Sequence, residues 1–191
     1  MTEPRIVPIA LDAAAPEARA TLDRARREMG MLPNLYRVLG HSPASLAGYD
    51  GFARGLDRGM LPKRVREQIA LVIATDNGCE YCLAAHRITG RIAKLSAAEI
   101  ASAERGIAVD AREQAALTLA RELCERTGDA SDGAIAGARD AGWSDADLVE
   151  IAAHVALNVF TNTINRFART PIDFGRVARA TGEVLARFGK G

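Results

Sequence analysis

Residues 67–86 read EQIALVIATDNGCEYCLAAH, and this stretch decides both the fold and the candidate chemistry. The run Ile69–Ala74 is apolar on every side of a helix, which is typical of a helix buried among other helices. The residues that follow are a strong local breaker, because Gly78 can take unusual dihedral angles and Asp76 or Asn77 can cap the next helix. The stretch therefore predicts a buried helix, a tight turn and a second helix that begins with the cysteines.

Helical periodicity continues over nearly the whole chain. Alanine is abundant, aromatic residues make up only 5%, and long alternating runs of β-branched residues are lacking. Helix-start signals recur, such as Ser42-Pro43 and the capping-box pair Ser96 and Glu99. Residues 61–74 and 143–160 share a layout, which suggests two related helical hairpins. The sequence predicts a compact all-α helical bundle with segments over roughly 14–29, 32–39, 43–58, 62–76, 79–93, 96–105, 110–127, 131–141, 144–167 and 171–187.

Composition excludes several classes of function. The 191 residues carry 25 basic and 24 acidic side chains, a formal charge of +1 with no long block of one sign. Such a balance argues against a nucleic-acid or anionic-membrane partner. The longest strongly apolar run has six residues, far fewer than the roughly 20 that span a bilayer. The N-terminus lacks the pattern of a secretory signal, so we expect a cytoplasmic protein.

The cysteine spacing predicts a reactive dithiol. On a helix with roughly 100° per residue, Cys79, Cys82 and His86 fall within an arc of about 60° and point the same way. The first turn of a helix carries unpaired N–H groups and the positive end of the macrodipole, which favour a thiolate. A thiol with the reference pKa of about 8.5 is only about 3% ionised at neutral pH, so a lowered pKa raises its reactive fraction strongly. A dithiol of this kind can reduce a peroxide or another oxidant and close its own disulfide.

An acid and a base accompany the dithiol. His86 follows Cys82 by four residues and can accept its proton. Glu67 lies one helix earlier, at the start of the segment that is apolar on every side, so its carboxylate needs a partner. The dithiol and His86 are natural partners for it.

Other interpretations of the same residues remain open. Two thiolates and an imidazole are three of the four ligands of a tetrahedral zinc site, for which Glu67 or His154 is a possible fourth. A purely structural cysteine pair is a further alternative. Cys124, in the apolar segment LARELCERTG, is most simply a buried packing thiol.

A second polar group lies on the segment 144–167. Its members follow helical spacing, which predicts a narrow polar stripe on an otherwise apolar helix. Such a stripe is more often a hydrogen-bonded seam between helices or subunits than a catalytic surface. The stripe consists of His154, Asn158, Thr161 and Asn165, with Asn162 beside it.

These residues resemble the alkylhydroperoxidase D-like members of the carboxymuconolactone decarboxylase superfamily, whose signature is E-x11-C-x2-C-x3-H. All four positions match, at Glu67, Cys79, Cys82 and His86. NGCEYCLAAH is similar to the peroxidase-related branch, as are MLPNLYRVLGHSP before it and TNTINRF near the end. The resemblance covers roughly residues 30–170. It implies one domain over 1–191 with 1–30 as an N-terminal extension, an all-α fold, a homo-oligomer and a thiol peroxidase activity that uses no cofactor.

Carried over by position, the resemblance makes Cys82 the peroxidatic thiol and Cys79 the resolving thiol, which together close a disulfide. His86 and Glu67 are then the proton relay. Tyr81 stands where the best-known members have a histidine. A phenol with a pKa near 10 is a poorer base, so the resemblance implies a relay that is weaker or that runs through Glu67 and His86.

The implied partners are a small-molecule hydroperoxide and a dithiol reductant, such as a lipoyl or thioredoxin-like donor. Three alternative functions stay open. They are another dithiol oxidoreductase such as a disulfide reductase, a decarboxylase-like lyase, and a zinc-binding module.

Overall fold

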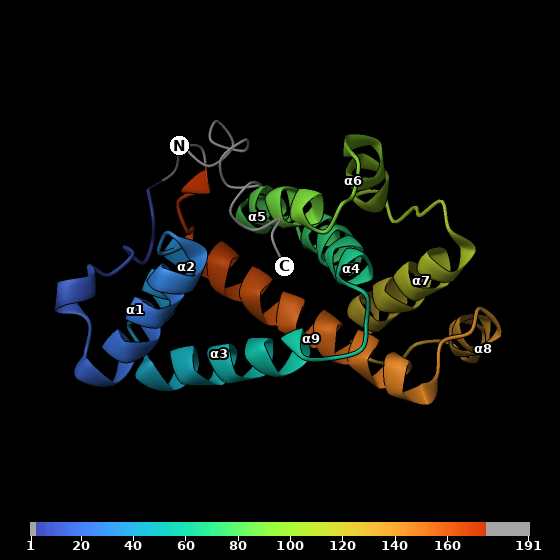
Figure 1. Ribbon diagram of the computed structural model, residues 1–191, viewed down its shortest axis with the longest axis horizontal. Coiled ribbons are helices and arrows are strands. Elements are labelled where there is room, and N and C mark those ends of the chain that lie inside the picture. Colours follow the sequence, from blue (N-terminus) through green and yellow to red (C-terminus); the bar gives the residue numbers. More distant parts are fainter. Residues whose placement is uncertain (1–2, 175–191) are drawn as a thin grey trace.

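The computed structural model describes residues 3–174, and within them the chain is an all-α bundle (Figure 1). A short 3₁₀ turn, η1 (Leu11–Ala13), precedes the first helix. The α-helices are α1 (Pro16–Met29), α2 (Asn34–Leu39), α3 (Pro43–Asp57), α4 (Lys63–Asp76), α5 (Glu80–Ile92), α6 (Ala97–Ala103), α7 (Ala111–Glu125), α8 (Asp132–Asp140) and α9 (Asp145–Ala168). The all-α prediction is confirmed, and each predicted segment up to residue 168 matches a helix to within two residues at either end. Most of the predicted segment 171–187 lies outside the described residues, and residues 171–173 are irregular.

The centre of the bundle is α4. Its residues 69–74 are each at most 2% exposed, because α5, α6, α7 and α9 pack around it. The long helix α9 crosses the molecule, with α1, α2 and α3 toward one end and α7 and α8 toward the other (Figure 1). One core cluster joins α4 to α7, α8 and α9, and a second gathers α1, α2 and the first turn of α5. The apolar run in the sequence is therefore the buried axis of the fold.

The turn between α4 and α5 places the cysteines. The Gly78 N–H donates to the Thr75 carbonyl and the Cys79 N–H to the Ala74 carbonyl, which is the Schellman pattern of helix termination. That pattern requires a left-handed residue, and Gly78 supplies it with φ of +60°. Cys79 thus ends α4 through its backbone and begins α5 through its side chain.

The predicted capping of α5 by Asp76 or Asn77 is wrong. Cys79 itself is the N-cap, and its sulfur accepts the Cys82 N–H at 3.3 Å. Asp76 is instead paired with Arg121 of α7 at 2.8 Å, and Asn77 caps the C-terminus of α4. The side chains of Asp76 and Asn77 both contact residues of α7, Arg121 and Cys124, which are distant in the sequence.

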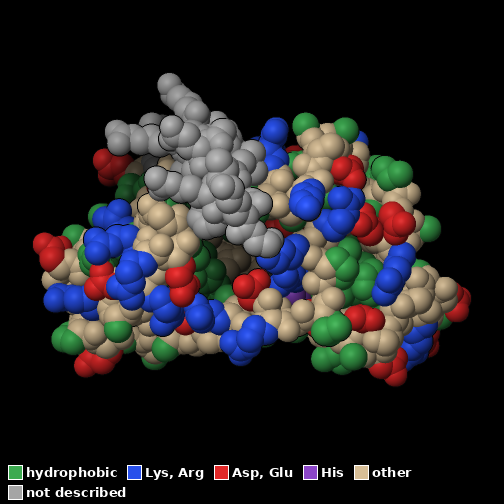
Figure 2. Space-filling view, in the orientation of Figure 1, with side chains coloured by type: hydrophobic (Ala, Val, Ile, Leu, Met, Phe, Trp, Pro, Cys, Tyr) green, Lys and Arg blue, Asp and Glu red, His purple; other side chains and the backbone are tan. Residues whose placement is uncertain are grey.

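Charged side chains of both signs are interspersed over the face seen in Figure 2, in keeping with the near-zero net charge. No helix within residues 3–174 is long and apolar enough to cross a membrane.

Replacing Gly78 with alanine tests the role of the turn. An added Cβ meets no atom within 4 Å, so the cost comes only from the positive φ and should be about 1 kcal/mol. Gly51, an exposed glycine inside α3, is the matched control, because its added Cβ also meets open space. Gly51→Ala should stabilise the protein by up to about 1 kcal/mol, since alanine favours a helix. Urea unfolding of both variants measures this, and two changes of the same sign would contradict the account.

Candidate functional site

The two cysteines of the predicted motif lie together at the start of α5. Cys79 and Cys82 form a disulfide, with their Cα atoms 5.3 Å apart. Both residues are buried, with 1% and 3% of their surface exposed. Their position in the first helical turn, as the sequence predicted, brings the sulfurs to the positive end of the α5 macrodipole. In the reduced state this environment favours a thiolate.

The predicted acid and base are also brought together. The Nδ1 atom of His86 lies 2.9 Å from Oε2 of Glu67, so the pair joins α5 to α4 one turn beyond Cys82. The two side chains are 25% and 21% exposed, in contrast to the buried sulfurs. Protons can therefore exchange between this pair and solvent while the dithiol stays in an apolar environment.

Sequence reasoning missed Thr89. Its hydroxyl donates to the same Glu67 oxygen that His86 contacts, so the carboxylate is held by two groups of α5. Thr89 follows His86 by three residues, so the two side chains lie on the same face of the helix. This spacing could have identified Thr89 as a site residue from the sequence.

Tyr81 takes no part in the Glu67–His86 pair. Its hydroxyl accepts the N–H of Leu35, at the start of α2, at 3.1 Å, and its ring packs against Phe174. Burial and the neighbouring Asp173 raise the pKa of Tyr81, so the phenol stays protonated. Tyr81 therefore anchors α5 to α2.

The polar stripe of α9 faces the interior as a seam between helices. Asn158 and Thr161 bond to carbonyls of their own helix. Asn162 donates to the Ile73 carbonyl of α4, and Asn165 donates to the Cys82 sulfur at 3.4 Å. The stripe thus reaches the dithiol, a contact that helical spacing alone does not predict.

His154 lies in this seam as a neutral side chain. Burial, followed by the nearby Arg66 of α4, lowers the pKa of His154 to about 4, against opposing effects of Glu150, Glu67 and Asp57. Its Nε2 is 3.9 Å from Glu150 and has no hydrogen-bond partner in the described part of the chain. Glu150 in turn accepts the backbone N–H groups of residues 60 and 61, ahead of α4. Glu150 of α9 therefore secures the entry of the central helix.

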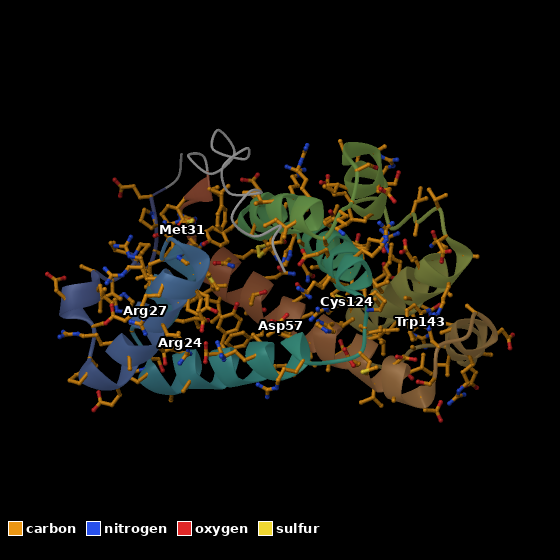
Figure 3. The ribbon with its side chains drawn as sticks, viewed as in Figure 1. Arg24, Arg27, Met31, Asp57, Cys124 and Trp143 are labelled. Carbon is orange, nitrogen blue, oxygen red and sulfur yellow. A yellow bond between two sulfur atoms is a disulfide. The ribbon has the colours of Figure 1, made fainter. Side chains whose placement is uncertain are left out.

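Cys124 lies apart from the dithiol, on the α7 side of α4 (Figure 3). It is partly buried, which is less than the full burial predicted, and it packs against the core cluster of α4, α7, α8 and α9. Burial raises the pKa of its thiol, and the Asn77 amide lies 3.8 Å from the sulfur. Its role as a packing thiol agrees with the sequence interpretation.

Within the part of the chain that the structure describes, no three His, Cys, Asp or Glu side chains come close enough together to hold a metal ion. The zinc alternative therefore finds no ligand set among these residues.

The environment of the sulfurs is apolar and rich in aromatic rings. Tyr36 and Tyr81 belong to the core cluster that contains both cysteines, and Tyr49, the third tyrosine of the chain, packs against it. Tyr49 packs edge-on against Tyr36 and stacks on Phe160 of α9. A partly solvated acid–base pair thus adjoins a buried dithiol with aromatic neighbours.

Comparison with known proteins agrees with this geometry. Residues 43–123 match the model of the carboxymuconolactone decarboxylase family, a range that contains the whole motif. Among curated proteins, none matches the chain.

Several solved structures share the fold. An uncharacterised peroxidase-related protein from Ralstonia eutropha JMP134, described as an alkylhydroperoxidase AhpD core, is 22% identical with a TM-score of 0.81, covering 91% of this chain and 94% of its own. A peroxidase-related protein from Silicibacter sp. TM1040 is 23% identical with a TM-score of 0.76, covering 90% and 94%. The debrominase Bmp8, in complex with 2,3,4-tribromopyrrole, is 18% identical with a TM-score of 0.75, covering 96% and 98%. At these identities the likeness shows a common fold.

The buried state of His154 predicts a pH-dependent stability. The unfolded chain binds a proton at this residue below about pH 6.5, whereas the folded chain resists it until about pH 4. Neutral His154 therefore costs no stability above pH 6.5. As the pH falls toward 4, the free energy of unfolding decreases by about 3 kcal/mol in all, because only the unfolded chain takes up the proton. Unfolding free energies in urea at pH 7 and pH 4.5 should differ less in His154→Leu than in the unmodified protein.

The exposed His41 provides the control, since His41→Gln should keep the unmodified pH profile. If the unfolding free energy changed with pH equally in His154→Leu and in the unmodified protein, His154 would not be the cause of the stability loss at low pH.

Proposed function

We propose that this chain, whose residues 43–123 match the model of the carboxymuconolactone decarboxylase family, is a thiol-dependent reductase of organic hydroperoxides. The observation that carries the proposal is the Cys79–Cys82 pair at the start of α5, closed as a disulfide, with the Glu67–His86 pair one turn further on. A dithiol that can close a bond between its own sulfurs stores the two electrons that a hydroperoxide requires.

The proposed reaction has two steps. The Cys82 thiolate attacks the terminal oxygen of ROOH, the O–O bond breaks, and Cys82 becomes a sulfenic acid while RO⁻ leaves and takes a proton from the His86–Glu67 pair. The Cys79 thiolate then attacks the Cys82 sulfur, the S–O bond breaks, and the hydroxyl leaves as water with a proton from the same pair. The sum is ROOH plus two thiols giving ROH, water and one disulfide. An external dithiol reduces that disulfide and completes the cycle.

The surroundings of the dithiol favour an organic hydroperoxide over hydrogen peroxide. Tyr36, Tyr81 and Phe160 belong to or pack against the same apolar cluster as the cysteines, so an alkyl or aryl group gains from burial there. Hydrogen peroxide has no apolar group to bury. We therefore expect kcat/KM to be higher for an aromatic hydroperoxide than for hydrogen peroxide.

Cysteine variants test the assignment of roles. Cys82→Ser should abolish hydroperoxide reduction, because the attacking sulfur is gone. Cys79→Ser should still consume about one equivalent of hydroperoxide and then stop, with a sulfenic acid on Cys82 that a dimedone-type reagent traps for mass spectrometry. Cys124→Ser is the matched control and should turn over like the unmodified protein.

The opposite pattern, with trapping on Cys79 in Cys82→Ser, would exchange the two roles. Full activity in Cys82→Ser would remove the thiol mechanism and favour the lyase, whose reaction needs no dithiol.

Glu67→Gln tests the relay. The variant keeps the shape of the side chain but removes the carboxylate that His86 and Thr89 contact, and kcat/KM should fall by about 10²-fold. Glu80→Gln removes the same charge from an exposed position in the first turn of α5. Since a negative charge near a thiolate opposes its ionisation, Glu80→Gln should leave the rate unchanged or raise it. Equal losses in both variants would mean that net charge, rather than a relay, sets the rate.

A second candidate is the reductive removal of halogen from an aromatic ring. The likeness to the debrominase Bmp8 and the aromatic neighbours of the dithiol favour it. Here Ar–Br and two thiols give Ar–H, HBr and one disulfide, so the same sulfurs supply the electrons. Release of bromide from 2,3,4-tribromopyrrole by the reduced protein, without reduction of cumene hydroperoxide, would favour this candidate.

A further inference from the structure

Asn165 of α9 contacts the candidate attacking sulfur directly. Its Nδ2 lies 3.4 Å from the Cys82 Sγ, and the residue is only 3% exposed. A donor held against a sulfur in a buried site strengthens as the sulfur becomes negatively charged, because a hydrogen bond to an ion is stronger than one between neutral groups. The contact therefore favours the thiolate over the thiol.

The other end of the same amide has no hydrogen-bond partner among residues 3–174. Oδ1 of Asn165 is buried there without a hydrogen bond, and Oδ1 of Asn162, on the adjacent turn, is in the same state. Buried carbonyl oxygens are nearly always bonded, so an unpaired one beside a reactive sulfur points to a group that arrives with a ligand. Since both atoms are acceptors, that group is a donor, an O–H or an N–H.

A hydroperoxide presents such a donor at the reacting atom. The terminal oxygen of ROOH is the one that the thiolate attacks, and it carries its hydrogen into the sulfenic acid. An acceptor beside the sulfur can hold this hydrogen before and after the O–O bond breaks.

We propose that Asn165 is a catalytic residue of this site, whose N–H stabilises the Cys82 thiolate and whose Oδ1 orients the hydroperoxide through its O–H group. The inference rests on the proposed hydroperoxide reductase function for its second half only. The first half concerns the thiolate and holds for any reaction that begins at Cys82.

The first experiment measures the ionisation of Cys82 without any peroxide. Cys82 is left as the single cysteine by Cys79→Ser and Cys124→Ser, and its rate of alkylation by iodoacetamide is followed against pH. Asn165→Leu, of similar shape but without hydrogen bonds, should raise the titration midpoint by about one pH unit. Asn165→Asp should raise it further, since a carboxylate repels the thiolate.

Thr161→Val is the matched control. Thr161 is buried one turn before Asn165 on the same helix, and its hydroxyl bonds to the carbonyl of Asn158. Its replacement should leave the midpoint of Cys82 unchanged. A purely structural role of Asn165 predicts the same midpoint in Asn165→Leu as in the protein with Asn165, and that result in a variant that remains folded by circular dichroism would overturn the inference. If Asn165→Leu fails to fold, Asn165→Ala, which also lacks the N–H group and adds no charge, decides, and a midpoint no higher than that of unmodified Asn165 overturns the inference.

The second experiment isolates the orienting role. Single-turnover reduction of cumene hydroperoxide is measured at a pH at which Cys82 is fully ionised in every variant, so the thiolate fraction no longer matters. Asn165→Leu should still be slower than the unmodified protein by about tenfold, because the hydroperoxide is no longer aligned. Equal rates there would remove the orienting role. If the unmodified protein reduces no hydroperoxide while the midpoint shifts as expected, the proposed function fails and the thiolate role of Asn165 stands.

Discussion

Burial of α4 on all sides is the constraint on which the rest of the molecule depends. A helix whose residues 69–74 are each at most 2% exposed must be surrounded, and α5, α6, α7 and α9 do so. The chain changes direction where this apolar run ends. The Schellman turn at Gly78 makes that change, and its last backbone bond belongs to Cys79. The residue that terminates the central helix is therefore one of the two cysteines of the disulfide.

This arrangement places two environments side by side, one around the dithiol and one around the Glu67–His86 pair. The sulfurs lie among apolar and aromatic side chains, whereas Glu67 and His86 keep contact with solvent. In the proposed reaction, a thiolate in the apolar environment meets an organic substrate, and the proton comes from the solvated side. The long helix α9 contacts the dithiol through Asn165, and its Glu150 accepts the backbone N–H groups at the entry of α4.

Much of this could be predicted from the sequence, because periodicity and capping are local properties. The helices up to residue 168 and the placement of Cys79 and Cys82 in one helical turn follow from spacing. The errors arose where distant residues compete for a side chain. Asp76 was expected to cap α5, but Arg121, 45 residues away, holds it.

The contacts between elements were beyond local reasoning. Asn165 and Cys82 are 83 residues apart, and only the packing of α9 on α5 brings them together. The sequence predicted a polar stripe along one face of α9, but only the fold shows that an amide of this stripe contacts a cysteine sulfur. Tyr81 was considered as a replacement for a relay histidine, yet its side chain turns toward α2 and bonds there.

The most direct test of the central claim is a count of free thiols. The protein is reduced, freed of reductant and mixed with one equivalent of cumene hydroperoxide, and thiols are counted within seconds while peptide mass spectrometry locates any new bond. The account predicts that two of the three thiols disappear as a Cys79–Cys82 disulfide and that Cys124 stays free. Survival of all three thiols, or a new bond that involves Cys124, would contradict it.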